Sequence, residues 1–161
     1  MIGNLRTVIK DYLQLQDDQI YIDNQNYKLT NIDKLIVILQ QGAVTVRGNN
    51  KKLLNDGTEQ ITVYYSETIS INLLSGNSEA REKQFDVIAA LNSQIAEYSQ
   101  RANGYKIFKI PNSMINVSAV EGGNVLNRFV IDVVIYTSRS SISGVQYYDD
   151  FSNKQTLTIE K

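Results

Sequence analysis

The beginning of the chain carries an apolar stripe at helical spacing. Its members recur three or four positions apart and are Ile2, Leu5, Val8, Ile9, Tyr12 and Leu13. Residues at these spacings share one side of a helix. Arg6, Lys10 and Asp11 then lie on the outward side. The pattern predicts an amphipathic helix that buries one stripe.

In the middle of the chain, apolar residues no longer recur at helical spacing but occur in β-branched runs or alternate with polar residues. Residues 20–22 predict a short strand, and the β-branched runs within 34–48 predict one strand or a bent pair. Residues 49–60 concentrate Asn, Asp and Gly, which is typical of a loop. In residues 63–73 the odd positions are mainly apolar and the even positions mainly polar. This last stretch predicts a strand with one buried face.

A second helical pattern begins at Ser78 and continues to about Ala102. Its main apolar stripe consists of Ala80, Val87, Ile88, Leu91, Ile95 and Tyr98. A weaker apolar stripe lies to its side and consists of Phe85, Ala89 and Ala96. Asn103-Gly104 is typical of a helix end. The sequence therefore predicts one long helix with a spare apolar side.

Strands are predicted again after this helix. Residues 105–111 and 115–121 form short runs, and Gly122-Gly123 separates the second run from a longer one at 125–139. Two adjacent glycines suit a hairpin turn that needs positive φ.

The longer run is apolar on both faces between residues 126 and 136, apart from Arg128 and Asp132. Such a strand is expected in the centre of a sheet with both faces covered. Two helices of one small chain cannot cover both faces, so a neighbouring subunit is expected to help.

These elements predict an α+β fold, in which a mainly antiparallel sheet has two helices packed on it. No repeat or linker divides residues 1–148, which we interpret as a single domain. Residues 149–161 are expected to form an arm or a short hairpin.

Composition narrows the chemistry that is available. Of the 161 residues 42% are apolar and 20% are charged, with a net charge of −1, which is ordinary for a soluble globular protein. The balanced charge provides no broad footprint for nucleic acid or an anionic membrane. Cys and His are absent, which excludes disulfides, imidazole bases and the usual zinc ligands. No signal-peptide pattern or membrane-spanning stretch is apparent, so we expect a chain made in the cytoplasm.

No catalytic, metal or cofactor site is predicted. The SGNS turn, residues 75–78, precedes a helix as phosphate loops do, but it has a single Gly and is followed by Glu79, which would repel an anion. We interpret the turn as a helix cap, with Asn77 or Ser78 as the capping residue. Asp132 lies on the same strand face as Arg128. We interpret them as a charge pair or a subunit contact rather than as a general acid and its partner.

Two other groups of residues have more than one interpretation. Arg47, Lys51 and Lys52 lie in or beside the predicted loop, where a solvated loop is favoured and a phosphate-facing loop is the alternative. The ten tyrosines include the pairs at 64–65 and 147–148. We interpret them as interface residues, with stacking on sugars or bases as the alternative.

Three stretches together resemble a known family. They are "ETISINLLS" at 67–75, "SEAREKQFDVIAAL" at 78–91 and "NRFVIDVVIY" at 127–136. With a helix before them and a short tail after them, they resemble the tail or neck terminator proteins of tailed bacteriophages. The resemblance covers about residues 1–148 and implies no catalytic residue.

The resemblance implies a virion protein that assembles as a homo-hexameric ring. Such a ring stops growth of the tail tube or joins the tube to the head, with DNA passing through its lumen. The implied partners are further copies of the chain, the tail-tube protein and the head-completion or connector proteins, and no membrane is implied. In this setting the subunit interface is expected to include Phe85, Ala89, Ala96, Arg128 and Asp132, and the lumen loop to include Arg47, Lys51 and Lys52.

Two alternatives stay open. The chain could be another virion component, such as a tail-tube or tail-completion protein. A different class is a small ligand-binding or regulatory module that uses the SGNS turn or the tyrosines. An enzyme is the least expected class, because no nucleophile and base are available in a convincing arrangement.

Overall fold

A computed structural model describes residues 1–23, 33–121 and 124–144 of the chain. Its helices are α1 (Ile2–Leu13), the 3-10 helix η1 (Asp17–Gln19), α2 (Glu79–Leu91) and α3 (Gln94–Asn103). Its strands are β1 (Ile20–Ile22), β2 (Ile36–Leu53), β3 (Thr58–Ser75), β4 (Tyr105–Lys109), β5 (Ile115–Asn116), β6 (Ala119–Glu121) and β7 (Asn124–Gly144).

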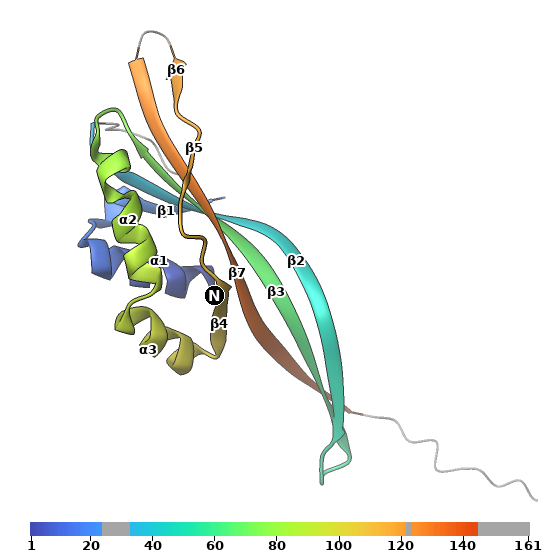
Figure 1. Cartoon of the computed structure of the whole chain (residues 1–161). Helices are drawn as coiled ribbons and strands as arrows, with labels where there is room; N and C mark the ends of the chain where they lie inside the picture. Colours follow the sequence, from blue (N-terminus) through green and yellow to red (C-terminus); the bar gives the residue numbers. More distant parts are fainter. Residues whose placement is uncertain (24–32, 122–123, 145–161) are drawn as a thin grey trace, which may run out of the picture.

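The strands follow the order β1-β2-β3-β7-β4, and β5 and β6 also pair with β7. The β1–β2 pair is parallel, and every other pairing of the described strands is antiparallel. Figure 1 shows the three α-helices gathered on one face of the sheet, while β2, β3 and β7 continue past them as a long curved ribbon. The short strand predicted at 20–22 is confirmed, and the long strand at 126–136 is central as predicted.

The core lies between the helices and the odd-numbered residues of β3 and β7. Leu73, Ile71 and Ile69 lie opposite Phe129, Ile131 and Val133 in register, and all six are buried. Helix α1 adds Leu5, Val8 and Ile9, which confirms the middle of its predicted stripe, whereas Tyr12 at the end of the stripe is exposed. Helix α2 adds Ala80, Val87 and Leu91. Alternation in the strands and helical spacing in the helices therefore meet in one apolar layer.

The predicted long helix at 78–102 is wrong, because the chain breaks after α2. Asn92 ends α2, and Ser93 begins α3 with extended backbone dihedrals. The Ser93 Oγ accepts a hydrogen bond from the Ala96 N–H at 3.2 Å, as an N-cap does. The break changes which side of the helix faces inward. Ile95 and Tyr98 are consequently exposed, although they were predicted on the buried stripe.

The predicted loop at 49–60 is also wrong. Strand β2 continues to Leu53 and β3 begins at Thr58, so the connection is a tight turn. In this turn the Asp56 Oδ1 accepts hydrogen bonds from the Thr58 Oγ1 at 2.6 Å and the Thr58 N–H at 3.0 Å. These bonds hold the pKa of Asp56 below its usual range. Backbone pairing along β2, β3 and β7 overrides the local preference of Asn and Gly for loops.

Gly57→Ala is expected to destabilise the ribbon by about 1 kcal/mol, because Gly57 has a φ of +80° in this turn. An added Cβ meets nothing within 4 Å, so the cost comes from the backbone alone. Gly48→Ala is the matched control, since Gly48 also has open space around it and an ordinary φ. Urea unfolding of both variants checks the expectation, and equal midpoints for the two would contradict it.

The fold class is confirmed at a coarse level. The described chain is a single unit of mixed helix and sheet. Its three α-helices replace the two that were predicted, because the second predicted helix is divided. The predicted arm at 149–161 lies outside the described residues.

Candidate functional site

The SGNS turn is held by the chain's own polar groups. The Ser75 Oγ accepts a hydrogen bond from the Ala80 N–H at 2.9 Å, and the Asn77 Oδ1 accepts one from the Glu79 N–H at 2.9 Å. These two side chains cap α2. Ser78 takes the N-cap position, but its hydroxyl donates to Glu82. The cap is therefore provided by Asn77 and by Ser75, which the sequence interpretation did not include.

The same turn ties three elements together. The Glu79 Oε2 accepts a hydrogen bond from the Leu35 N–H at 2.9 Å, next to the start of β2. The Asn127 side chain donates to the Asn77 carbonyl at 2.6 Å from β7. The carboxylate and amide groups are thus used within the fold, so the turn has the geometry of a structural corner.

The sheet face opposite the helices, called the open face from here on, carries the even-numbered residues of β3 and β7. Arg128 and Asp132 both lie on it, but each has a separate partner. Arg128 donates from Nη2 and Nε to the Asn72 Oδ1, at 2.8 and 3.3 Å. Asp132 accepts a hydrogen bond from the Ser70 hydroxyl. The expected Arg128–Asp132 ion pair is absent among the described residues, because cross-strand neighbours lie nearer than residues four apart along a strand.

The open face also has an apolar surface that the described helices leave uncovered. Val130 and Val134 of β7 are half-buried, and Ile115 of β5 lies beside Val130 in register with 67% of its surface exposed. Phe108 packs edge-on against Tyr136, with ring centroids 4.9 Å apart, yet remains largely exposed. Apolar side chains in this state are typical of surfaces that contact another protein.

A second apolar surface lies on α2 and consists of Phe85 and Ala89, one helical turn apart; it is called the α2 surface below. Phe85 is 64% exposed and Ala89 is exposed as well. Ala96 was grouped with them from the sequence, but it is fully buried on α3. The helix break turns Ala96 toward the core. Ala96 is therefore part of the chain's own packing and not of a surface.

The three predicted lumen cations lie on strand β2 and do not converge. Lys51 makes an ion pair with Glu59 at 3.4 Å. Arg47 donates from Nε to the Ser66 Oγ at 3.0 Å, and its guanidinium lies 5.9 Å from the centroid of the Tyr136 ring. Lys52 follows Lys51 directly on a strand, so the two side chains point to opposite faces.

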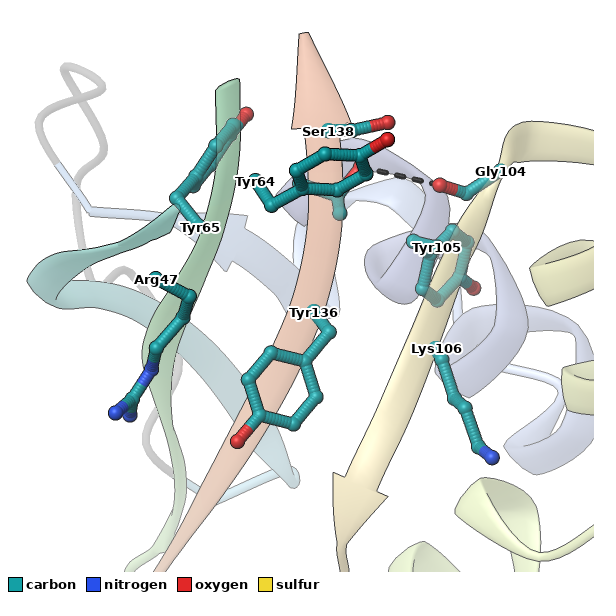
Figure 2. A pocket seen from close by; sticks show the side chains of 9 residues that line it. Arg47, Tyr64, Tyr65, Gly104, Tyr105, Lys106, Tyr136 and Ser138 are labelled. Carbon is teal, nitrogen blue, oxygen red and sulfur yellow. Dashed lines mark hydrogen bonds between the residues drawn. The ribbon is translucent and has the colours of Figure 1, made fainter. Parts of the chain in front are cut away.

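Arg47 also lines a shallow hollow beside the start of β4, which was not predicted from the sequence. The hollow has a volume of about 500 Å³, and its walls include Tyr64, Tyr65, Tyr105, Tyr136, Lys106 and Arg47. These side chains come from β2, β3, β4 and β7, and Figure 2 shows them with Ser138 of β7. The sequence showed many tyrosines but could not indicate that four of them line one hollow, since strand pairing brings their backbone positions together.

The floor of the hollow is rigid and neutral. The Tyr105 hydroxyl lies 2.9 Å from the Ser99 Oγ of α3, and the Thr137 hydroxyl donates to the Gly104 carbonyl at 3.1 Å. Burial raises the pKa of Tyr105, although its hydrogen bond with Ser99 opposes the shift. The tyrosine consequently stays protonated up to high pH. Neither Arg47 nor Lys106 makes an ion pair with another described residue.

Within residues 1–23, 33–121 and 124–144, no group of carboxylates has the arrangement of a metal site. None of the described helices is long and apolar enough for a membrane span. No protein-family model matches the chain, and no curated protein matches its sequence.

Proposed function

We propose that the chain is a structural assembly protein of a tailed-phage virion, a tail or neck terminator that works as a closed ring of identical subunits. Two observations support this proposal. One is the family resemblance in residues 67–75, 78–91 and 127–136, and the other is the pair of exposed apolar surfaces, the α2 surface and the open face. The proposed partners are further copies of the chain, the tail-tube protein and the head-completion or connector proteins.

One observation carries the proposal, namely two different apolar surfaces on opposite sides of the sheet. The α2 surface lies on the helix side, and the open face lies on the other side (Figure 1). A ring needs such a pair, because each subunit must offer one surface to the next copy and a different one to the previous copy. A two-fold dimer would use the same surface on both subunits.

The ribbon of β2, β3 and β7 supports the same role. Val44, Val46, Leu53 and Ile142 are all exposed on its surface. After Leu39 in β2 and after Thr137 in β7, each strand pairs with β3 along one edge, while its other edge has no strand partner among the described residues. Uncovered strand edges with apolar side chains favour contact with other chains. In a ring, the ribbons provide the walls that contact the tube or the connector.

We propose that DNA passing through the ring contacts its inner surface without a specific binding site. With Lys51 paired to Glu59 and Arg47 bonded to Ser66, the ribbon has no concentrated basic patch at these positions. A lumen of low positive charge suits DNA that slides and does not bind tightly.

Light scattering and negative-stain images of the purified chain test the proposal. Rings of uniform size with a central hole are expected, and a monomer that persists at every concentration, also with tail tubes added, would contradict it. Tail tubes that grow by addition of tail-tube protein are expected to stop growing when the rings are present. Stacks or tubes formed by the chain itself would favour the tail-tube alternative.

A further inference from the structure

We propose that the hollow beside β4 is the docking site for residues 147–151 of a second copy of the chain. The inference deepens the proposed function, on which it rests, because it names a contact between subunits of the ring.

The hollow is suited to aromatic side chains accompanied by negative charge. Tyr64, Tyr65 and Tyr136 line the hollow and are at least partly exposed, and the buried Tyr105 is at its floor. Arg47 and Lys106 add two cations, and none of the residues that line the hollow is acidic. The Arg47 guanidinium is held in place by Ser66 and the Tyr136 ring, which leaves its terminal nitrogens free of an ion pair with any described residue. A held cation loses less entropy when a carboxylate binds it.

The chain itself contains a segment with this chemistry. Residues 147–151 read Tyr-Tyr-Asp-Asp-Phe, so three aromatic side chains and two carboxylates occur within five positions. They follow β7, which ends at Gly144 near the far end of the ribbon. The partner is therefore matched in both charge and side-chain type.

Chain length indicates a second copy as the source of the segment. The hollow lies at Tyr136–Ser138, about seven residues before Gly144, which is about 23 Å along a strand. Asp149 and Asp150 are five and six residues beyond Gly144, so even a fully extended chain that turned straight back would span at most about 18 and 22 Å. Because reversing the chain direction itself uses about two or more of these residues, the carboxylates of a neighbour in a ring reach the hollow with fewer constraints than those of the same chain.

Crosslinking between separately labelled copies tests the inference, since the natural chain has no cysteine. Ser138→Cys places a thiol at the hollow, and Ser152→Cys places one beside the acidic segment while keeping residues 147–151 intact. One protein carries a mass tag, the two are mixed, and a short bis-maleimide is added. A crosslinked product of tagged plus untagged mass is expected, at least tenfold above that with Gln94→Cys, an exposed position on α3.

Removing the charges of Arg47 and Lys106 shows whether these two cations bind residues 147–151 of the second copy. Arg47→Gln with Lys106→Gln, in the Ser138→Cys protein, is expected to lower the crosslinking rate at least tenfold. Lys51→Gln with Lys52→Gln removes the same charge elsewhere on the ribbon and is expected to leave the rate unchanged. Equal rates for the two pairs would overturn the inference.

The remaining outcomes separate the inference from the proposed function. Rings without the mixed crosslink would overturn the docking of residues 147–151 and leave the ring proposal standing. A crosslink found only within one chain, in a protein carrying both cysteines, would overturn docking between copies. A persistent monomer without any mixed crosslink would overturn both.

Discussion

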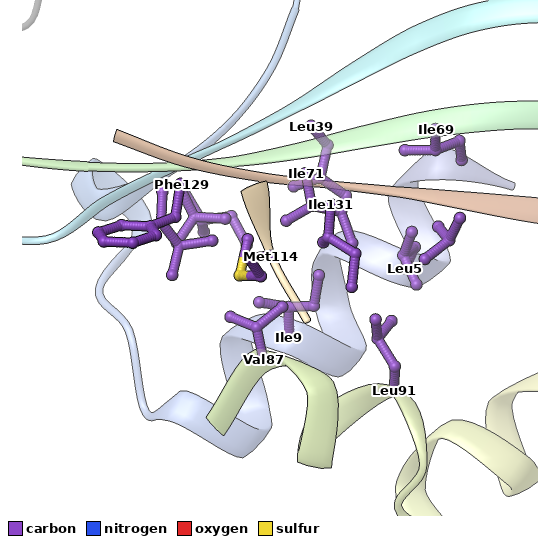
Figure 3. Close-up of a cluster of buried hydrophobic side chains, with 14 of the residues drawn as sticks. Leu5, Ile9, Leu39, Ile69, Ile71, Val87, Leu91, Met114, Phe129 and Ile131 are labelled. Carbon is purple, nitrogen blue, oxygen red and sulfur yellow. The ribbon is translucent and has the colours of Figure 1, made fainter. Parts of the chain in front are cut away.

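Replacing Ile71 by alanine is expected to lower the free energy of unfolding by about 2–5 kcal/mol. Ile71 is fully buried in β3, where Leu39 of β2 and Ile131 of β7 are its neighbours in register. Figure 3 shows the three side chains together beneath the sheet, facing the helices. Removing three carbons there loses transfer free energy and leaves a cavity, because strands on both sides and helices below limit collapse.

Ile142→Ala is the matched control, with the same chemical change on β7 at a position that is 64% exposed. It is expected to change the free energy of unfolding by less than about 0.5 kcal/mol. Urea unfolding followed by circular dichroism, at concentrations low enough to exclude assembly, measures both variants. Similar losses in the two would mean that the layer between sheet and helices is not the main source of stability.

The buried side of the fold could be predicted well from the sequence. Alternation in 63–73 indicated which residues of β3 lie inward, and the stripe from Ile2 to Leu13 indicated the inward side of α1. Both are local patterns whose period is set by backbone geometry. The burial of Ile69 and Leu5 follows from such a period without knowledge of their partners.

The division of the second helix was harder to predict. Asn92-Ser93 carries capping residues, but the apolar positions on both sides still fit one continuous helical period. The packing of α3 against α1 and β4 favours the break, and the Ile107 N–H of β4 donates to the Gln100 side chain of α3 at 2.9 Å. Ala96 was consequently assigned to the wrong surface.

The ribbon and the hollow depend on partners far away in sequence. Asn and Lys in 49–53 favour loops locally, yet β3 pairs with them residue by residue. The hollow combines residues near 47, 64, 105 and 136, so no local pattern could reveal it. Arg128 likewise takes Asn72, which is 56 positions earlier in the chain, in place of the nearer Asp132.

The two surfaces of the proposed ring yield the second major prediction. Phe85→Glu on the α2 surface and Ile115→Glu on the open face are each expected to leave the chain folded but monomeric. Both side chains are more than half exposed, so folding tolerates the change, whereas a buried unpaired carboxylate in an interface is expected to weaken association roughly a hundredfold, about 2.7 kcal/mol. Gln94→Glu, which adds a carboxylate at an exposed position of α3, is expected to assemble normally.

Mixing the two monomeric variants then distinguishes a ring from a two-fold dimer. The Phe85→Glu protein keeps an intact open face, and the Ile115→Glu protein keeps an intact α2 surface. If the α2 surface of one copy binds the open face of the next, the mixture forms one-to-one dimers that cannot grow, because each dimer has a blocked surface at both ends. Native mass spectrometry measures this directly. A mixture that stays monomeric would show that the α2 surface and the open face do not bind each other. Homodimers of either variant alone would show that its intact surface binds its own kind, and full-size rings would show that neither surface is part of the subunit contact.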